Sequence, residues 1–222
     1  MTEQLPPSVA ARYNPPKLAP WSMTAVFSYI LRFHDCLMSG ADSPEQAAQA
    51  LEEIGNHLPC EVIPASDGSV YMRRFLVAEI VGGGAIYLQQ ICRPDEDCEH
   101  HSHPRKEGEA FILVYGYTEE RLHENPKVPG EFKVVSATFT PGMSNDINFD
   151  DFHRIAKLNG PCSWSLFFVS EKAKRAPGED SWSFKHPATG KVTGYKTFLA
   201  DKAARRRGAG STRTLGSFAG RS

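Results

Sequence analysis

Two stretches in the first quarter of the chain place hydrophobic residues at the three- and four-residue intervals of an amphipathic helix. The first runs from Thr24 to about Met38, and the second begins at Ser43 with Pro44 at its first helical position. In the second stretch, small and aliphatic residues such as Ala47 and Leu51 form one stripe. The pattern therefore predicts two helices that cover one end of the remaining structure.

After Pro64 the pattern changes to short runs of branched and aromatic residues, separated by glycine or proline turns. Gly82, Gly83 and Gly84 form a strong turn signal between two of these runs. About nine strands are predicted, at residues 70–79, 85–93, 109–117, 132–140, 146–149, 153–158, 163–170, 182–185 and 192–199. Many short strands with this spacing are typical of an antiparallel sandwich or barrel.

The two ends of the chain differ in composition from its central part. Residues 1–22 contain five prolines, which lack an amide donor and disfavour a helix. Residues 201–222 carry six basic residues and one acidic residue, so the rest of the chain has an acidic excess. We expect an extended lead-in over 1–22, a helical cap over 23–60, a barrel over 65–200 and a basic, disordered tail over 201–222.

The overall composition fits one globular domain of 222 residues, with 41% hydrophobic and 23% charged residues. No apolar run is long enough to cross a bilayer, and the first residues lack the pattern of a secretory signal. The five cysteines include no C-x-x-C pair, which indicates reduced thiols. These features predict a cytoplasmic protein without a membrane partner, and the acidic body argues against a nucleic-acid partner.

A histidine pair stands out just before a predicted strand. His101 and His103 are two residues apart, so in an extended segment both imidazoles point to the same side and can reach one ion. Glu109 follows six residues later, and His153 lies in a later predicted strand. Two histidines, a carboxylate and a distant third histidine form a good ligand set for a divalent transition metal.

These residues resemble the cupin superfamily. Its first motif (H-x-H, a few residues, E, six residues, G) corresponds to His101, His103, Glu109 and Gly116, whereas its second motif is degraded around Pro141-Gly142 and His153. The resemblance implies a mainly β fold, a cupin-type double-stranded β-helix (jelly-roll) barrel preceded by two α-helices. It also implies a metal held by His101, His103 and His153. Glu109 would be a fourth ligand, or it would contact the ligands without binding the metal itself.

Within the superfamily, the layout is most similar to the cysteine dioxygenase branch of thiol dioxygenases. The stretches that carry this similarity are Tyr71–Leu76, the histidine pair, His153-Arg154 and Thr189–Lys191. The resemblance implies three histidines that bind Fe(2+) and an arginine, Arg73, that holds the substrate carboxylate through its forked donors. The neighbouring Arg74 competes for the inward position. Ser165 matches a serine of the family's substrate site.

The cysteine–tyrosine pair of that branch has no counterpart, which favours a substrate other than cysteine. We expect an iron dioxygenase, and hence an oxidoreductase, that acts with O2 on a small carboxylate- or thiol-bearing molecule, with Glu109 adjusting the iron or acting as a base. One alternative is a cupin isomerase or lyase that uses Zn, Ni or Mn as the Lewis acid. Another is a non-enzymatic ligand-binding cupin. Homodimerisation stays open, since barrels with exposed edge strands commonly dimerise.

Overall fold

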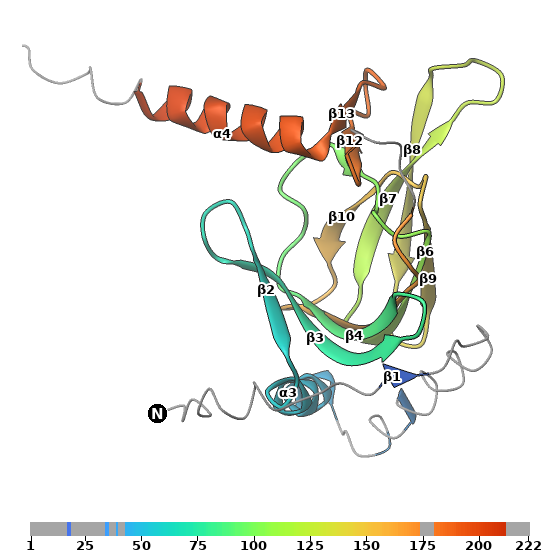
Figure 1. Cartoon of the computed structure of the whole chain (residues 1–222), viewed down its shortest axis with the longest axis vertical. Coiled ribbons are helices and arrows are strands. Elements are labelled where there is room, and N and C mark those ends of the chain that lie inside the picture. Colours follow the sequence, from blue (N-terminus) through green and yellow to red (C-terminus); the bar gives the residue numbers. More distant parts are fainter. Residues whose placement is uncertain (1–16, 19–33, 36–38, 40–42, 174–179, 212–222) are drawn as a thin grey trace, which may run out of the picture.

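The computed structural model describes residues 17–18, 34–35, 39, 43–173 and 180–211 (Figure 1). The predicted helix from Thr24 to about Met38 lies outside these residues except for His34 and Asp35, and most of the proline-rich lead-in also lies outside them. Within the described part of the chain, no helix combines the length and apolar character needed to cross a membrane.

The strands form two sheets that face each other (Figure 1). The first sheet has the order β1 (Lys17–Leu18), β3 (Val70–Ile80), β4 (Gly84–Ile91), β11 (Ser163–Val169), β6 (Glu107–Val114) and β9 (Ser144–Asn148), with β2 (Cys60–Pro64) also paired to β3. The second has the order β13 (Val192–Gly194), β12 (Ser183–Lys185), β5 (His100–His101), β10 (His153–Leu158), β7 (Tyr117–Glu124) and β8 (Phe132–Phe139). All strand pairs except β1–β3 are antiparallel. The expectation of a mainly β, antiparallel two-sheet fold is confirmed at this level.

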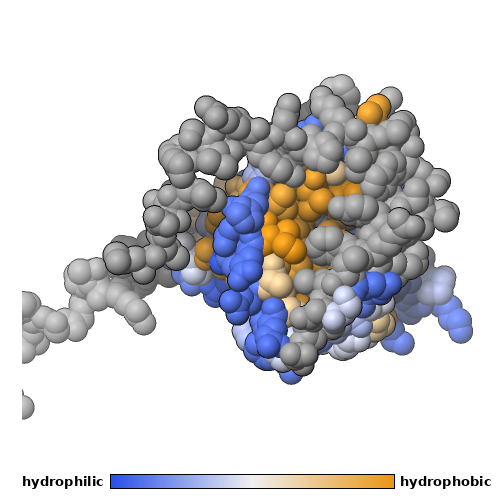
Figure 2. Space-filling model, turned by 90° about the horizontal axis from the view of Figure 1, so that it is seen from below, coloured by the Kyte–Doolittle hydropathy of each residue, from blue (hydrophilic) through white to orange (hydrophobic). Residues whose placement is uncertain are grey.

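One helix packs against the outer face of the first sheet. This helix, α3 (Pro44–Gly55), begins where the sequence predicts, and the Ser43 side chain accepts a hydrogen bond from the Gln46 amide at 3.3 Å. Ala47 and Leu51 of the helix are fully buried. Seen from below, hydrophobic residues gather on this side of the molecule (Figure 2).

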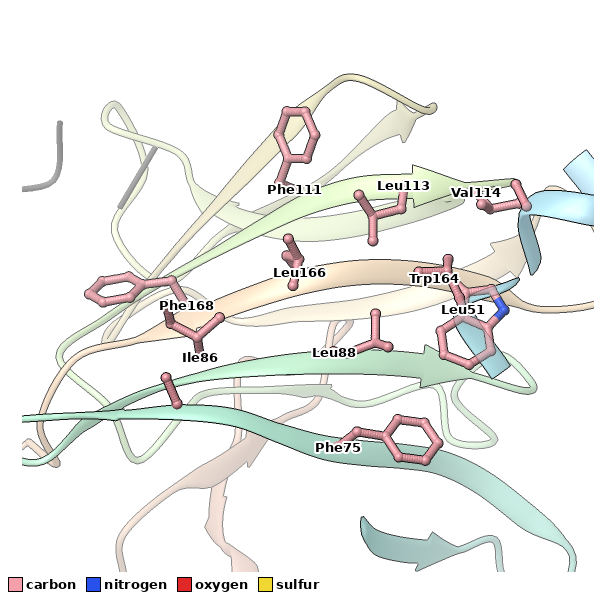
Figure 3. Packing of buried hydrophobic residues seen from close by; sticks show 12 residues of the cluster. Leu51, Phe75, Ile86, Leu88, Phe111, Leu113, Val114, Trp164, Leu166 and Phe168 are labelled. Carbon is pink, nitrogen blue, oxygen red and sulfur yellow. The ribbon is translucent and has the colours of Figure 1, made fainter. Parts of the chain in front are cut away.

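The outer cluster is built from side chains that alternate along each strand. Phe75, Trp164, Leu166 and Phe168 belong to this cluster together with Leu51 of α3. Trp164 lies beside Leu51, and Phe168 lies at the opposite end of β11 (Figure 3). The rings of Phe75 and Trp164 are stacked with 6.0 Å between centroids. The aromatic run over 164–168 is therefore largely core, as its strand spacing predicts.

A second cluster fills the space between the sheets. It joins first-sheet residues such as Met72, Ile112 and Phe167 to Tyr117 and Ile155 of the second sheet. Because successive residues of a strand point to opposite faces, each first-sheet strand contributes to both clusters. The polar residues between the two sheets are therefore the candidates for a functional site.

The fold differs from the sequence prediction in several strands and at the start of the tail. Strands β1, β2 and β5 were not predicted. Strand β7 was missed because its inward positions include Glu119 and Arg121, so the segment shows no apolar alternation. The predicted strand 192–199 ends at Gly194, where helix α4 (Tyr195–Ser211) begins, so the expected tail is helical up to residue 211 rather than disordered. The alanine- and arginine-rich sequence of this segment has high helix propensity. Residues 212–222 lie outside the described residues.

Candidate metal centre

The pairing of two strands brings three histidines together. His101 of β5 is the direct antiparallel partner of His153 of β10, and His103 follows two residues after His101. The ring centroids of the three histidines are 4.8–5.2 Å apart, and ligand nitrogens of all three lie within 4.8 Å of one another. The Nε2 atoms of His103 and His153 are 2.5 Å apart. The imidazoles therefore converge on one point, as the sequence predicts.

The surroundings keep these imidazoles in the form that binds metals. Desolvation lowers the pKa of His101 from 6.5 to about 4 and lowers the pKa of His103 well below its usual value. A neutral imidazole retains a nitrogen lone pair for a cation, whereas imidazolium has none. The donor set thus fits a divalent transition metal, and the chemistry of three neutral nitrogens suits iron, zinc or nickel better than manganese, which prefers oxygen ligands.

A buried carboxylate that sequence reasoning missed supports one ligand. Glu119 of β7 is 1% exposed, and its Oε2 accepts a hydrogen bond from Nδ1 of His153 at 2.7 Å. Burial opposes ionisation of Glu119, but its interactions with His153 and Arg121 outweigh the burial and lower the pKa to about 2. Since a carboxylate can only accept, Nδ1 of His153 carries the proton and Nε2 is left free for a metal.

Further hydrogen bonds hold Glu119 in place. Its Oε1 accepts from Nε of Arg121 at 2.6 Å, and its Oε2 also accepts from Nδ2 of Asn145 at 2.7 Å. The same Asn145 amide donates to the hydroxyl of Tyr117 at 2.9 Å. Both carboxylate oxygens are therefore engaged, so Glu119 orients His153 rather than offering a free base.

The histidines line a cavity of about 760 Å³ between the two sheets. Its walls are mostly apolar, with Met72, Ile91 and Phe167 on one side and Ile155, Trp182 and Phe184 on the other. Leu199, Lys202 and Ala203 of α4 line it as well. The Lys202 ammonium forms ion pairs with Glu96 and Asp97, which also line the cavity. Helix α4 is thereby fixed against the loop that precedes β5.

The predicted carboxylate ligand, Glu109, does not reach the histidines. It is buried on β6, and its Oε1 accepts a hydrogen bond from the Ser144 hydroxyl at 2.7 Å. Its neighbour Ala110 lines the cavity. Because adjacent strand residues face opposite sides, Glu109 points away from the metal site, which corrects the expected role as ligand or base.

Strand alternation also corrects the choice between the two arginines. Arg73 forms an ion pair with Glu52 of α3 on the outer side of the first sheet. Arg74 points the other way and lines the cavity. Ser165 lines the cavity as well. Arg73 does not line the cavity, so it is not placed to hold a substrate carboxylate there.

A second group of side chains could hold a metal. Ligand atoms of Cys98, Glu99 and His186 lie within 4.8 Å of one another, and Cys98 is exposed. Unlike the three-histidine cluster, this group does not line the cavity. It provides a control for any measurement of metal stoichiometry.

Comparisons with known proteins identify no family. No protein-family model matches the chain, and no curated protein matches it. Among solved structures, an Fe(II) form of HppE is similar with a TM-score of 0.38 at 9% identity, covering 51% of this chain and 57% of that one. Hydroxypropylphosphonic acid epoxidase from S. wedmorenis gives 0.34 at 12% identity, covering 50% and 55%.

The capsular polysaccharide assembling protein CapF from Staphylococcus aureus is similar with a TM-score of 0.38 at 14% identity, covering 56% of this chain and 31% of that one. The matches thus span about half of the epoxidase chains and about a third of CapF. The fold and site by themselves define a two-sheet β protein with a candidate three-histidine metal centre in a cavity between the sheets.

Proposed function

We propose that the protein is a metal-dependent cupin-type enzyme, specifically a mononuclear non-haem iron dioxygenase that acts on a small carboxylate- or thiol-bearing molecule. The observation that carries the proposal is the convergence of His101, His103 and His153 on the wall of the interior cavity. The strand orders β4-β11-β6-β9 and β5-β10-β7-β8 support a jelly-roll barrel, since the chain passes back and forth between the two sheets.

The protein's own groups suit this chemistry. Iron(II), when bound, would supply the activation of O2, which amino-acid side chains do not perform. Glu119 fixes the proton on Nδ1 of His153 and so presents its Nε2. The mostly apolar walls suit the carbon skeleton of a small molecule, and Arg74 provides a cation for an acidic substrate group. A cavity of about 760 Å³ accommodates a small organic molecule.

The isomerase or lyase alternative requires a free base beside the metal. Its candidate, Glu109, faces the opposite side of β6, and both oxygens of Glu119 are engaged in hydrogen bonds. No observation in the described residues therefore favours that reaction over oxygen chemistry. A non-enzymatic ligand-binding role becomes one outcome of the test.

The test begins with the metal content of the purified protein, followed by anaerobic loading with Fe(II). We expect one iron per chain at this site and O2 consumption that matches the loss of a thiol or small acid from a panel. His103→Ala should lose both, whereas His123→Ala, which changes an exposed histidine of β7, should keep both. Cys98→Ser shows whether any metal binds at the second group.

Each other result has a definite meaning. Substrate conversion that continues without oxygen would replace the dioxygenase with an isomerase or lyase. Ligand binding that is unchanged in His103→Ala, with no metal bound to the wild type, would leave a non-enzymatic protein.

A further inference from the structure

Three neighbouring strands of the first sheet place polar side chains in one row on the cavity side. Arg74 of β3 is the direct partner of Gln89 of β4, and Gln89 is the direct partner of Ser165 of β11. All three line the cavity. The row on one side contains Met72 and Ile91 and ends at Ser163, which does not line the cavity, and the row on the other side contains Leu76, Tyr87 and Phe167. The row is therefore a polar strip across an otherwise apolar wall.

Each member of this polar row has a buried atom without a hydrogen-bond partner among the described residues. These atoms are Nε of Arg74, Oε1 of Gln89 and Oγ of Ser165. Gln89 is 7% exposed and Ser165 is 1% exposed, so these groups belong to the cavity wall rather than to the open surface. Leaving a buried polar atom unsatisfied is unfavourable, and these three differ from the other unpartnered atoms of the first sheet, on Gln90, Ser163 and Trp164, because their residues line the cavity.

The chemistry of the polar row is complementary rather than uniform. The Gln89 Nε2 lies 3.1 Å from Sδ of Met72, and a thioether can only accept, so the amide nitrogen faces Met72 and Oε1 remains an acceptor. Arg74 offers a charged donor at its Nε, and the Ser165 hydroxyl can donate or accept. Neighbouring strands are about 4.8 Å apart, so the row presents a donor and an acceptor within the width of one small head group.

The polar row is also close to the candidate metal centre. Arg74 and His103 line the main cavity together and share a smaller cavity of about 70 Å³. A molecule seated on the row would thus extend toward the histidines.

We infer that this row is the subsite for a head group that combines an anion with an adjacent hydrogen-bond donor, as in a hydroxy acid or an amino acid. Gln89 is then a specificity-determining residue, because its Oε1 accepts a hydrogen bond that a plain acid cannot donate. Arg74 binds the anion, and Ser165 adapts to either group. The inference rests on the proposed function only in that the bound molecule is taken to be the substrate.

The experiment measures binding of propionate, lactate and alanine to the zinc-loaded protein without oxygen, by calorimetry. These acids share a three-carbon skeleton and differ in the group next to the carboxylate. We expect lactate or alanine to bind about fivefold or more tightly than propionate, as one added hydrogen bond provides. The comparison of lactate with alanine distinguishes a hydroxyl from an ammonium donor.

Gln89→Leu should bind all three acids as weakly as the wild type binds propionate, and Arg74→Gln should weaken all three. Gln90→Leu is the matched control, since Gln90 is 8% exposed and also has an unpartnered Oε1 but does not line the cavity. It should retain the wild-type preference. Circular dichroism and thermal melting confirm that each variant is folded.

Equal binding of the three acids by the wild type would overturn the inference. The absence of binding at acid concentrations up to about 10 millimolar, where even a weak complex is detected, would overturn it as well. The same loss of preference in Gln90→Leu would overturn it too. If the preference is present but no iron-dependent oxygen consumption occurs, the subsite stands and the proposed function fails. If the protein consumes oxygen with a substrate that binds equally well to the wild type and to Gln89→Leu, the proposed function stands and the subsite fails.

Discussion

Replacing Glu119 by glutamine tests whether this buried carboxylate prepares the metal centre. Its two oxygens accept hydrogen bonds from His153, Arg121 and Asn145. Glutamine has one carbonyl oxygen and one NH2 group of similar shape. If the oxygen keeps His153 and Asn145 as partners, the NH2 group faces the Arg121 donor, and donor then opposes donor.

The size of the effect follows from the strength of these contacts. A pKa that lies near 2 instead of 4.5 corresponds to roughly 3 kcal/mol of favourable interaction for the Glu119 carboxylate. Outer hydrogen bonds to ligating histidines typically change metal affinity about 10- to 100-fold. We therefore expect Glu119→Gln to bind zinc or iron(II) about 10- to 100-fold more weakly and to unfold at lower urea concentration.

The assay is competition for zinc against a fluorescent chelator, with urea unfolding of the metal-free protein measured in parallel. Glu120→Gln is the matched control, because Glu120 is next along β7 and pairs with Arg154 without touching a candidate ligand. Unchanged zinc affinity in Glu119→Gln would refute the assigned role. An equal loss in Glu120→Gln would show that any charge removed from β7 has this effect.

Three more results are expected. Desolvation lowers the pKa of His100 and of His101 to about 4, so below pH 6.5 the unfolded chain takes up protons that the folded chain does not. The contribution of these two histidines to the stability of the metal-free protein is therefore fully present above pH 6.5. It should fall by roughly 2–3 kcal/mol per histidine toward pH 4. Urea titrations at several pH values check this, and a flat profile would contradict the burial of these side chains. Leu51→Ala should lower the unfolding free energy by about 2–5 kcal/mol, because Leu51 is fully buried between α3 and the first sheet. Added zinc should raise the melting temperature of the wild type, with reversal by a chelator, and His103→Ala should show no such response.

The histidine cluster was predictable because its geometry is local. The two-residue spacing of His101 and His103 requires only an extended backbone, and His153 needs one antiparallel pairing to join them. The strands with apolar alternation were predictable for the same reason. Glu119 was not, since a strand whose inward side chains are charged looks like a polar loop in sequence.

The predictions for Glu109 and for the two arginines were wrong for the same reason. Adjacent residues of a strand face opposite sides of the sheet, so a shift of one residue changes the side that each of them faces. Between His103 and β6 the chain passes through an irregular segment, so the side of the sheet that Glu109 faces cannot be counted from the histidines. Arg73 and Arg74 are adjacent, and a shift of one residue exchanges the cavity for the outer face. The pairing of β3 with β4 and the contact of Arg73 with Glu52 decide which of the two arginines faces the cavity.

The position of α4 separates the residues that could bind a metal from part of the wall around them. The three histidines belong to β5, the residues just after it and β10, whereas Leu199 and Lys202 of α4 line the cavity. Lys202 joins α4 to the loop before β5 through Glu96 and Asp97. A chain that ends before Tyr195 would therefore keep all three candidate ligands and lose the part of the cavity wall that α4 provides.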